Sequence, residues 1–160
     1  MFLRQGAVFT VISLAFAATP ALADVDFVAA DACIQGRIEA GTPVLECLEA
    51  ASADCAANGS DASSTAALCY REVKDGWSGG IKTLLDKVNA AASEDIATIA
   101  AIEVKYDILT GLLQCDRMEE LALAVSDQPA EAILRQKSQC EAMVSGNAYA
   151  RLFWRSRDVK

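Results

Sequence analysis

The chain of 160 residues contains no histidine. Ser-His-Asp triads, Cys-His dyads, the usual haem ligands and histidine-bearing zinc sites all need an imidazole, so these classes of site are excluded. Positive charge is also scarce, because 14 lysines and arginines stand against 22 aspartates and glutamates, a formal charge of −8. Nucleic-acid binding requires a net positive surface, and we therefore expect no nucleic-acid partner.

Large side chains are scarce as well. Aromatic residues make up only 6% of the chain, whereas alanine alone contributes 31 residues. The length suits one domain, but a core of small side chains buries little apolar area and gains from covalent cross-links. The six cysteines are the candidates for those cross-links.

Long hydrophobic runs are missing, and no segment reaches the roughly 20 apolar residues that cross a bilayer. The N-terminus comes nearest, with Arg4, an apolar run over Ala7–Ala18, and Pro20 before the small-residue stretch Ala21–Ala23. This order is typical of a secretory signal peptide. We therefore predict that residues 1–23 are a signal peptide and not a membrane anchor.

Cleavage between Ala23 and Asp24 would leave residues 24–160 as a single mature domain. Arg4 leaves with the signal peptide, so 13 basic and 22 acidic residues remain and the mature charge is −9. No cysteine follows the cleavage site to carry a lipid, and we expect no stable membrane insertion after cleavage. The predicted location is the bacterial periplasm or the extracellular space.

An exported protein meets an oxidising compartment, where an even number of cysteines indicates disulfides and not a metal site. The chain has no Cys-x-x-Cys pair, so neither a zinc knuckle nor a thioredoxin-type redox site is predicted. We expect no metal and no cofactor. No nucleophile is patterned with a base, and the protein is not expected to be an enzyme.

The segments between turns are rich in Ala, Leu, Glu and Lys, which favour helix, and no apolar–polar alternation indicates a strand. Turn residues occur at Gly41–Pro43, Asn58–Asp61, Ala92–Asp95 and Ser126–Pro129. The predicted fold is all-α, an antiparallel bundle of about five helices joined by three disulfides. The helices are expected over residues 25–39, 44–57, 62–91, 95–125 and 129–156.

Two of these helices carry an apolar stripe at helical spacing. In the segment 62–91 it consists of Val73, Trp77, Ile81, Leu84 and Val88. In the segment 95–125 the spacing alternates between three and four residues, at Ile99, Ile102, Tyr106, Leu109 and Leu113. We predict that Trp77, Tyr106 and Leu109 belong to the structural core.

Three glycines interrupt the segment 62–91, at Gly76, Gly79 and Gly80. Each weakens a helix by about 1 kcal/mol relative to alanine. We predict one helix across them, with a break at Gly79–Gly80 as the alternative.

The cysteines lie in three pairs, each placed symmetrically about one of the turns. Residues equidistant from the turn of an antiparallel helical hairpin face one another. Cys47 and Cys55 fall on one predicted helix about 12 Å apart, too far for a disulfide. The predicted pairs are Cys33–Cys47, Cys55–Cys69 and Cys115–Cys140. The alternatives are Cys33–Cys55 with Cys47–Cys69, or a nested Cys33–Cys69.

Between Cys33 and Asn89 the chain carries a distinctive series of residues, namely Cys47-Leu48-Glu49-Ala50-Ala51, Cys55, Ser64-Thr65, Cys69, Glu72, Trp77, Leu85 and Asn89. This series resembles the lysozyme inhibitor LprI-like family, small exported bacterial proteins also classed as a domain of unknown function. Family members carry a Cys-Leu or Cys-Ile pair on an alanine-rich helix, a further cysteine, Ser-Thr before another cysteine, and then Glu and Trp on a long helix. Cys115 and Cys140 match the two C-terminal cysteines of such proteins.

The sequence departs from the family just before its fifth cysteine. Family members usually have a tryptophan and an Arg-Asp step there, whereas this chain has Tyr106–Gln114 with neither. A binding surface that uses that element would be lost or changed in this protein.

The resemblance implies a binding protein whose partner is lysozyme, inhibited by occlusion of the glycan cleft. The mature charge of −9 would steer association with a strongly basic enzyme. The sequence leaves the binding surface and the oligomeric state undetermined, but the loops at Asn58–Ser64 and Gly41–Pro43 are the first candidates. Another exported protein is the alternative partner. The alternative function is a periplasmic structural or envelope-stress protein that has no lysozyme partner and self-associates through its helices.

One further cluster has the composition of an interface, namely Phe153–Trp154 beside Arg151, Arg155 and Arg157. Basic residues in a last helical turn also interact favourably with the helix dipole. We interpret this cluster as structural, closing the end of the bundle.

Overall fold

The computed structural model describes residues 24–57 and 62–159, and within these ranges it is all-α with no strand. The predicted fold class is therefore confirmed. The predicted signal peptide, including Ala23, and the turn at Asn58–Asp61 lie outside the described residues. The helices are α1 (Phe27–Glu39), α2 (Leu45–Ala50), α3 (Ala53–Ala57), α4 (Ser63–Ala91), α5 (Glu94–Val125) and α6 (Ala130–Ser156).

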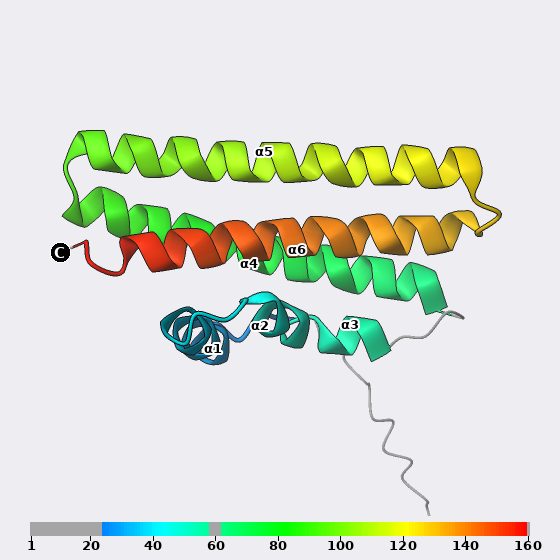
Figure 1. The fold of residues 1–160 in the computed structure, drawn as a ribbon, viewed down its shortest axis with the longest axis horizontal. Coiled ribbons are helices and arrows are strands. Elements are labelled where there is room, and N and C mark those ends of the chain that lie inside the picture. The colour runs from blue at the N-terminus through cyan, green and yellow to red at the C-terminus, as the bar shows by residue number, and fades with distance from the viewer. Residues whose placement is uncertain (1–23, 58–61, 160) are drawn as a thin grey trace, which may run out of the picture.

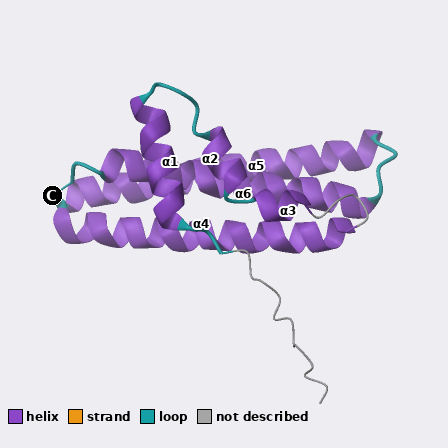
Figure 2. Cartoon of the chain, turned by 90° about the horizontal axis from the view of Figure 1, so that it is seen from below, coloured by secondary structure: helices purple, strands orange, loops and turns teal. Residues whose placement is uncertain are grey.

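The three long helices α4, α5 and α6 lie side by side, and the short helices α1–α3 pack against the side of α4 and α6 that is opposite to α5 (Figure 1). Helices α5 and α6 are antiparallel, as two ion pairs between them show. Asp107 of α5 pairs with Arg151 of α6, whereas Asp116, which lies later in α5, pairs with Lys137, which lies earlier in α6. Helix α1 runs across the long helices (Figure 2).

Local sequence explains both ends of α1. Helix α1 begins where the carboxylate of Asp26 accepts hydrogen bonds from the backbone N–H groups of Val28 and Ala29 at 3.0 and 3.1 Å. It ends before Gly41, whose φ of 67° only glycine adopts easily. Helix α4 is continuous across its three glycines, so the prediction of one helix is confirmed.

The prediction of one helix over 44–57 is wrong, because α2 and α3 are separated by a turn at Ala51–Ser52. The Ser52 hydroxyl donates to the carbonyl oxygens of Leu48 and Glu49, an interaction that bends helices. The turn also allows both cysteines of this segment to form their disulfides, because Cys47 must face α1 whereas Cys55 must face α4.

The three disulfides join the pairs expected from the hairpin registers. The Cα–Cα distances are 5.8 Å for Cys33–Cys47, 5.4 Å for Cys55–Cys69 and 5.7 Å for Cys115–Cys140. No described cysteine is free. The first bridge joins α1 to α2, the second joins α3 to α4, and the third joins α5 to α6, so each bridge links two helices that are consecutive in the chain.

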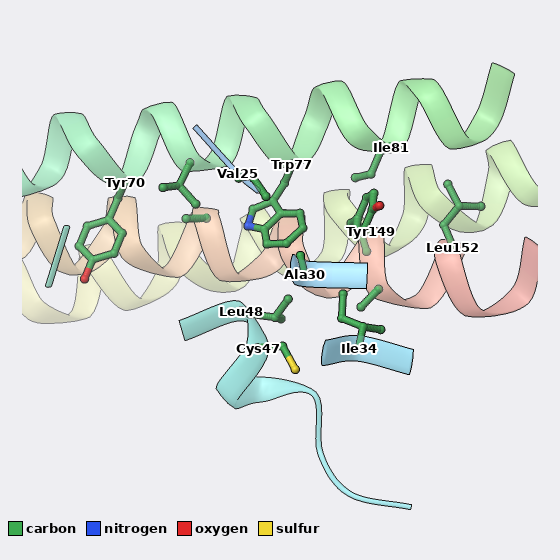
Figure 3. Packing of buried hydrophobic residues seen from close by; sticks show 14 of the residues in the cluster. Val25, Ala30, Ile34, Cys47, Leu48, Tyr70, Trp77, Ile81, Tyr149 and Leu152 are labelled. Atoms are coloured by element: carbon green, nitrogen blue, oxygen red, sulfur yellow. The ribbon is translucent and has the colours of Figure 1, made fainter. Parts of the chain in front are cut away.

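The core lies where α1 and α2 meet α4 and α6 (Figure 3). Trp77 from α4 is 1% exposed and is the largest side chain in this core, as its stripe predicts. Ile34 from α1 and Leu48 from α2 are fully buried beneath it. The short disulfide-linked helices therefore complete the core that the long helices leave open.

The prediction that Tyr106 and Leu109 belong to the core is wrong, because their side chains are 61% and 48% exposed. The whole stripe of large apolar residues on α5 points to solvent. Helix α5 buries its opposite side, which carries small residues such as Ala97 and Cys115. Small residues let two helices approach closely: a Cβ added at Gly111 would lie 2.5 Å from the side chain of Val144 on α6.

Candidate functional site

The layer formed by α1–α3 is strongly acidic. Residues 24–57 contain seven carboxylates and one basic residue, Arg37, a net charge of −6 out of the −9 that residues 24–160 carry. Six of the seven carboxylates are exposed, and the seventh, Asp31, is half-buried. Arg37 pairs with Glu46, so the only cation of the layer is already engaged. This layer therefore presents a negative surface.

A pocket of about 470 Å³ opens where α1 crosses α4 beside α6. Its lining combines aromatic rings with charged groups and a glycine-rich stretch of α4. The lining residues are Asp24, Phe27, Asp31, Asp75, Gly76, Gly79, Gly80, Thr83, Leu84, Lys87, Tyr149 and Phe153. Because these residues come from three helices, the pocket exists only when α1 is docked on the long helices.

Four aromatic rings form one side of this pocket and the core behind it. The ring centroids of Phe27 and Tyr149 are 5.1 Å apart, and Phe153 stacks on Tyr149 at 6.2 Å. Trp77 packs behind Tyr149, also at 5.1 Å, and Figure 3 shows these two side chains pointing into the same part of the core. Ring faces of this kind attract cations.

Three carboxylates surround the aromatic rings. The Tyr149 hydroxyl donates a hydrogen bond to Asp31 at 2.6 Å. Burial, and then this hydrogen bond, raise the pKa of Tyr149 well above its usual value, so the hydroxyl stays protonated. Asp24 and Asp75 lie at the rim, and both are exposed. With Lys87 as the only basic residue of the lining, the pocket has a net charge of −2.

Glycines on α4 make the approach of α1 possible. A Cβ at Gly80 would overlap the ring of Phe27 and lie 2.9 Å from the ring of Tyr149, and one at Gly76 would lie 3.0 Å from Val25. Gly79, in contrast, has no atom within 4 Å of its Cβ position. Two of the three glycines that weaken the helix by propensity thus form the surface on which α1 and the residue Val25 before it pack.

The C-terminal cluster is divided between the pocket and the bundle. Phe153 lines the pocket, whereas Trp154 lies beneath the guanidinium group of Arg157, 3.2 Å from the ring centroid. Arg151 and Arg155 form ion pairs with Asp107 and Glu103 of α5. All three arginines are therefore engaged within the chain, as their structural interpretation predicts.

The Gly41–Pro43 loop projects beyond the side of the three long helices (Figure 2). The ion pair between Arg37 and Glu46 closes its base, and the Thr42 hydroxyl donates to the Arg37 carbonyl oxygen at 3.1 Å. Of the other predicted loop, Asn58–Ser64, only residues 62–64 are described, and Ser63 is buried at the start of α4. Only the first loop is therefore placed as a protruding element.

Within the described ranges, no three His, Cys, Asp or Glu side chains are grouped closely enough to hold a metal ion. None of the helices that the structure describes is long and apolar enough to cross a membrane.

Sequence reasoning missed the residues that define the pocket, Asp31, Asp75 and Tyr149, because they are distant in the chain and belong to no motif. The signal that could have found the place is the spacing of Gly76 and Gly80, which puts two glycines on one face of α4. No family model, curated protein or solved structure matches this chain.

Proposed function

We propose that this protein is an exported binding protein and not an enzyme, and that its acidic α1–α3 layer docks on a basic protein partner. The observation that carries the proposal is the pocket between α1, α4 and α6, where three carboxylates surround aromatic rings. An arginine or lysine of the partner would enter this pocket, with its charge near Asp24 and Asp75 and its aliphatic stem on Phe27 and Phe153.

Lysozyme is the partner that the family resemblance implies. Its basic charge would be attracted by the −6 of the α1–α3 layer, whose helix α1 also lines the pocket. The protruding Gly41–Pro43 loop would be the element that enters a cleft built for a sugar polymer. The internal disulfide Cys33–Cys47 holds the two helices that flank this loop, which reduces the entropy lost on binding.

Export is part of the same proposal. The predicted signal peptide would direct the chain to the periplasm or the extracellular space and be removed before Asp24. The three disulfides need an oxidising compartment to form and persist. Intact-mass measurement of the protein recovered from the bacterial envelope would give the mass of residues 24–160 less six hydrogens. A mass that retains residues 1–23 would contradict the cleavage.

The function is tested by the rate at which lysozyme clears a suspension of bacterial cell walls, with and without the mature protein at low salt. We expect inhibition that weakens as salt is added, because the attraction is electrostatic. Normal clearing in the presence of a micromolar excess of the protein would remove lysozyme as the partner.

A pair of double variants tests the pocket itself. Asp24→Asn with Asp75→Asn removes two rim charges, and we expect about tenfold weaker binding because these charges would face a cation of the partner. Asp127→Asn with Glu131→Gln is the matched control, because it removes two exposed carboxylates from the α5–α6 turn and the first turn of α6, neither of which lines the pocket. Equal weakening by both pairs would show that only net charge matters and that the pocket binds nothing.

A further inference from the structure

The outer side of α5 carries a continuous apolar stripe. Its five large side chains are each about half exposed or more, namely Ile99, Ile102, Tyr106, Leu109 and Leu113. Together they expose roughly 500 Å² of largely apolar surface, at the upper end of what monomeric proteins leave open. Helix α5 is the outermost of the long helices, on the side away from α1–α3 (Figure 1), so no described segment covers the stripe.

The spacing of the stripe is that of a two-helix seam. Intervals of three and four residues keep side chains on one line of a helix that packs along a second helix, as in a coiled coil. The side of α5 that faces α6 uses other residues, among them Ala97, Val104 and Cys115. The stripe is therefore a second packing surface, which the bundle leaves unoccupied.

Opposite charges stand at the two ends of the stripe, at equal distances from its centre. Asp95 lies eleven residues before Tyr106, and Arg117 lies eleven residues after it. Eleven residues are about three turns, so both charges are in line with Tyr106. Both side chains are exposed.

Neither of these two charges forms an ion pair with another described residue. By contrast, the carboxylates of α5 that face α6 are all paired: Glu103 with Arg155, Asp107 with Arg151, and both Asp116 and Glu119 with Lys137. The charges at the ends of the stripe are thus available to an external partner.

We propose that a second copy of this chain covers the stripe, with the two α5 helices antiparallel and related by a two-fold axis at Tyr106. In this arrangement Asp95 of each copy meets Arg117 of the other, and the apolar residues on either side of Tyr106 face one another. A parallel pair would instead place Asp95 against Asp95 and Arg117 against Arg117. The charges therefore select the antiparallel pair.

The area agrees with a reversible dimer. Covering both stripes removes about 1,000 Å² from water, the lower bound for a specific interface, and the flanking polar residues add to it. This inference does not depend on the proposed function, because the acidic layer and its pocket lie on the opposite side of the bundle.

The first test is the molar mass of the mature protein in solution, by size-exclusion chromatography with light scattering at 1 to 100 µM and low salt. We expect a dimer at the upper concentrations. Tyr106→Glu places two carboxylates together on the axis and should leave only monomer. Met118→Glu is the matched control, because Met118 is also exposed on α5 (48%, against 61% for Tyr106) but lies away from the stripe; it should still dimerise.

A charge exchange tests the orientation. Asp95→Arg alone and Arg117→Asp alone should each weaken the dimer about tenfold at low salt, because each turns two attractions into two repulsions. The double variant Asp95→Arg with Arg117→Asp should restore wild-type affinity. In a parallel pair Asp95 already faces Asp95 and Arg117 faces Arg117, so each single variant would replace one like-charge repulsion by another and would not weaken the dimer.

Three results would overturn the proposal: a wild-type monomer at 100 µM, a dimer that Tyr106→Glu leaves intact, or single charge variants that the double variant fails to rescue. Helical circular dichroism of each variant separates a lost interface from a lost fold. A monomer at 100 µM with normal inhibition of lysozyme would refute this inference alone.

Discussion

The contact of α1 with α4 can be tested by adding a single methyl group at either of two adjacent positions. At Gly79 the methyl group meets nothing within 4 Å, whereas at Gly80 it overlaps the ring of Phe27 and lies 2.9 Å from Tyr149. Gly→Ala in a helix contributes about 1 kcal/mol of stability. Gly79→Ala should therefore raise the free energy of unfolding by about that amount.

At Gly80 the same gain is outweighed. Both rings that the new methyl group meets are held by further ring contacts, and overpacking of such a site costs up to about 3 kcal/mol. Gly80→Ala should therefore lower the free energy of unfolding by about 2 kcal/mol. The near-ultraviolet circular dichroism of the aromatic cluster should weaken as Phe27 is displaced.

The assay is urea denaturation with the disulfides intact, followed by far-ultraviolet circular dichroism, for wild type and both variants. The predicted difference between the variants is about 3 kcal/mol, which exceeds the error of linear extrapolation. If Gly80→Ala raised the urea midpoint as much as Gly79→Ala does, α1 would not lie against α4 at this glycine, and the pocket would not exist.

Two further predictions concern the covalent and polar links of the fold. Replacing Cys115 and Cys140 by serine should lower the free energy of unfolding by about 3.5 kcal/mol, because the unfolded chain loses a 25-residue loop constraint; a loss below about 1 kcal/mol in urea would contradict this. Because the pKa of Tyr149 is raised on folding, the protonated hydroxyl contributes to the free energy of unfolding below pH 10. This contribution is lost as the pH rises above that value. Tyr149→Phe should lower the free energy of unfolding by about 1 kcal/mol at pH 8, because Asp31 loses its hydrogen-bond donor. The variant should also make stability less sensitive to pH above 10. An unchanged pH dependence in urea titrations would argue against the raised pKa.

The disulfides and the turns at Gly41–Pro43, Ala92–Asp95 and Ser126–Pro129 follow from the sequence because each depends on short-range information, whereas the turn at Ala51–Ser52 is not predicted. The glycine at position 41 marks a turn, and Gly41 is the one described residue with a positive φ. Helix α5 begins with Glu94 and Asp95, whose charges lie beside the N-terminal N–H groups. The position of a turn then sets the register of the helices that it joins. Cysteine pairing follows from that register, as Cys115–Cys140 illustrates.

The face that a long helix buries is harder to predict, and α5 shows why. The helix has two apolar lines, one of large residues through Tyr106 and one of small residues through Ala97 and Cys115. Hydrophobicity favours the first line as the core. Contact with α6 selects the second, because Gly111 lets the helices approach closely and the disulfide at Cys115 fixes which side faces inward.

The pocket could not be predicted because it depends on how α1 crosses the long helices. Asp31 and Tyr149 are 118 residues apart and meet only through that crossing. Helical periodicity describes each helix separately and contains no information on crossing angles. The two glycines of α4 that mark the crossing are, by propensity alone, only weak points of a helix.

The two proposed surfaces are compatible because they lie on opposite sides of the bundle, with α4 and α6 between them (Figure 1). Two copies joined through α5 would hold their acidic layers apart, each with a charge of −6. Joining the copies through those layers would instead bring like charges together, so electrostatic repulsion favours the α5 side.

A dimer of this kind would present two outward-facing pockets, and partners held on one cell wall would be bound at both. Bivalent attachment raises the effective affinity without any new contact, so a weak single site would suffice for the inhibition that we propose.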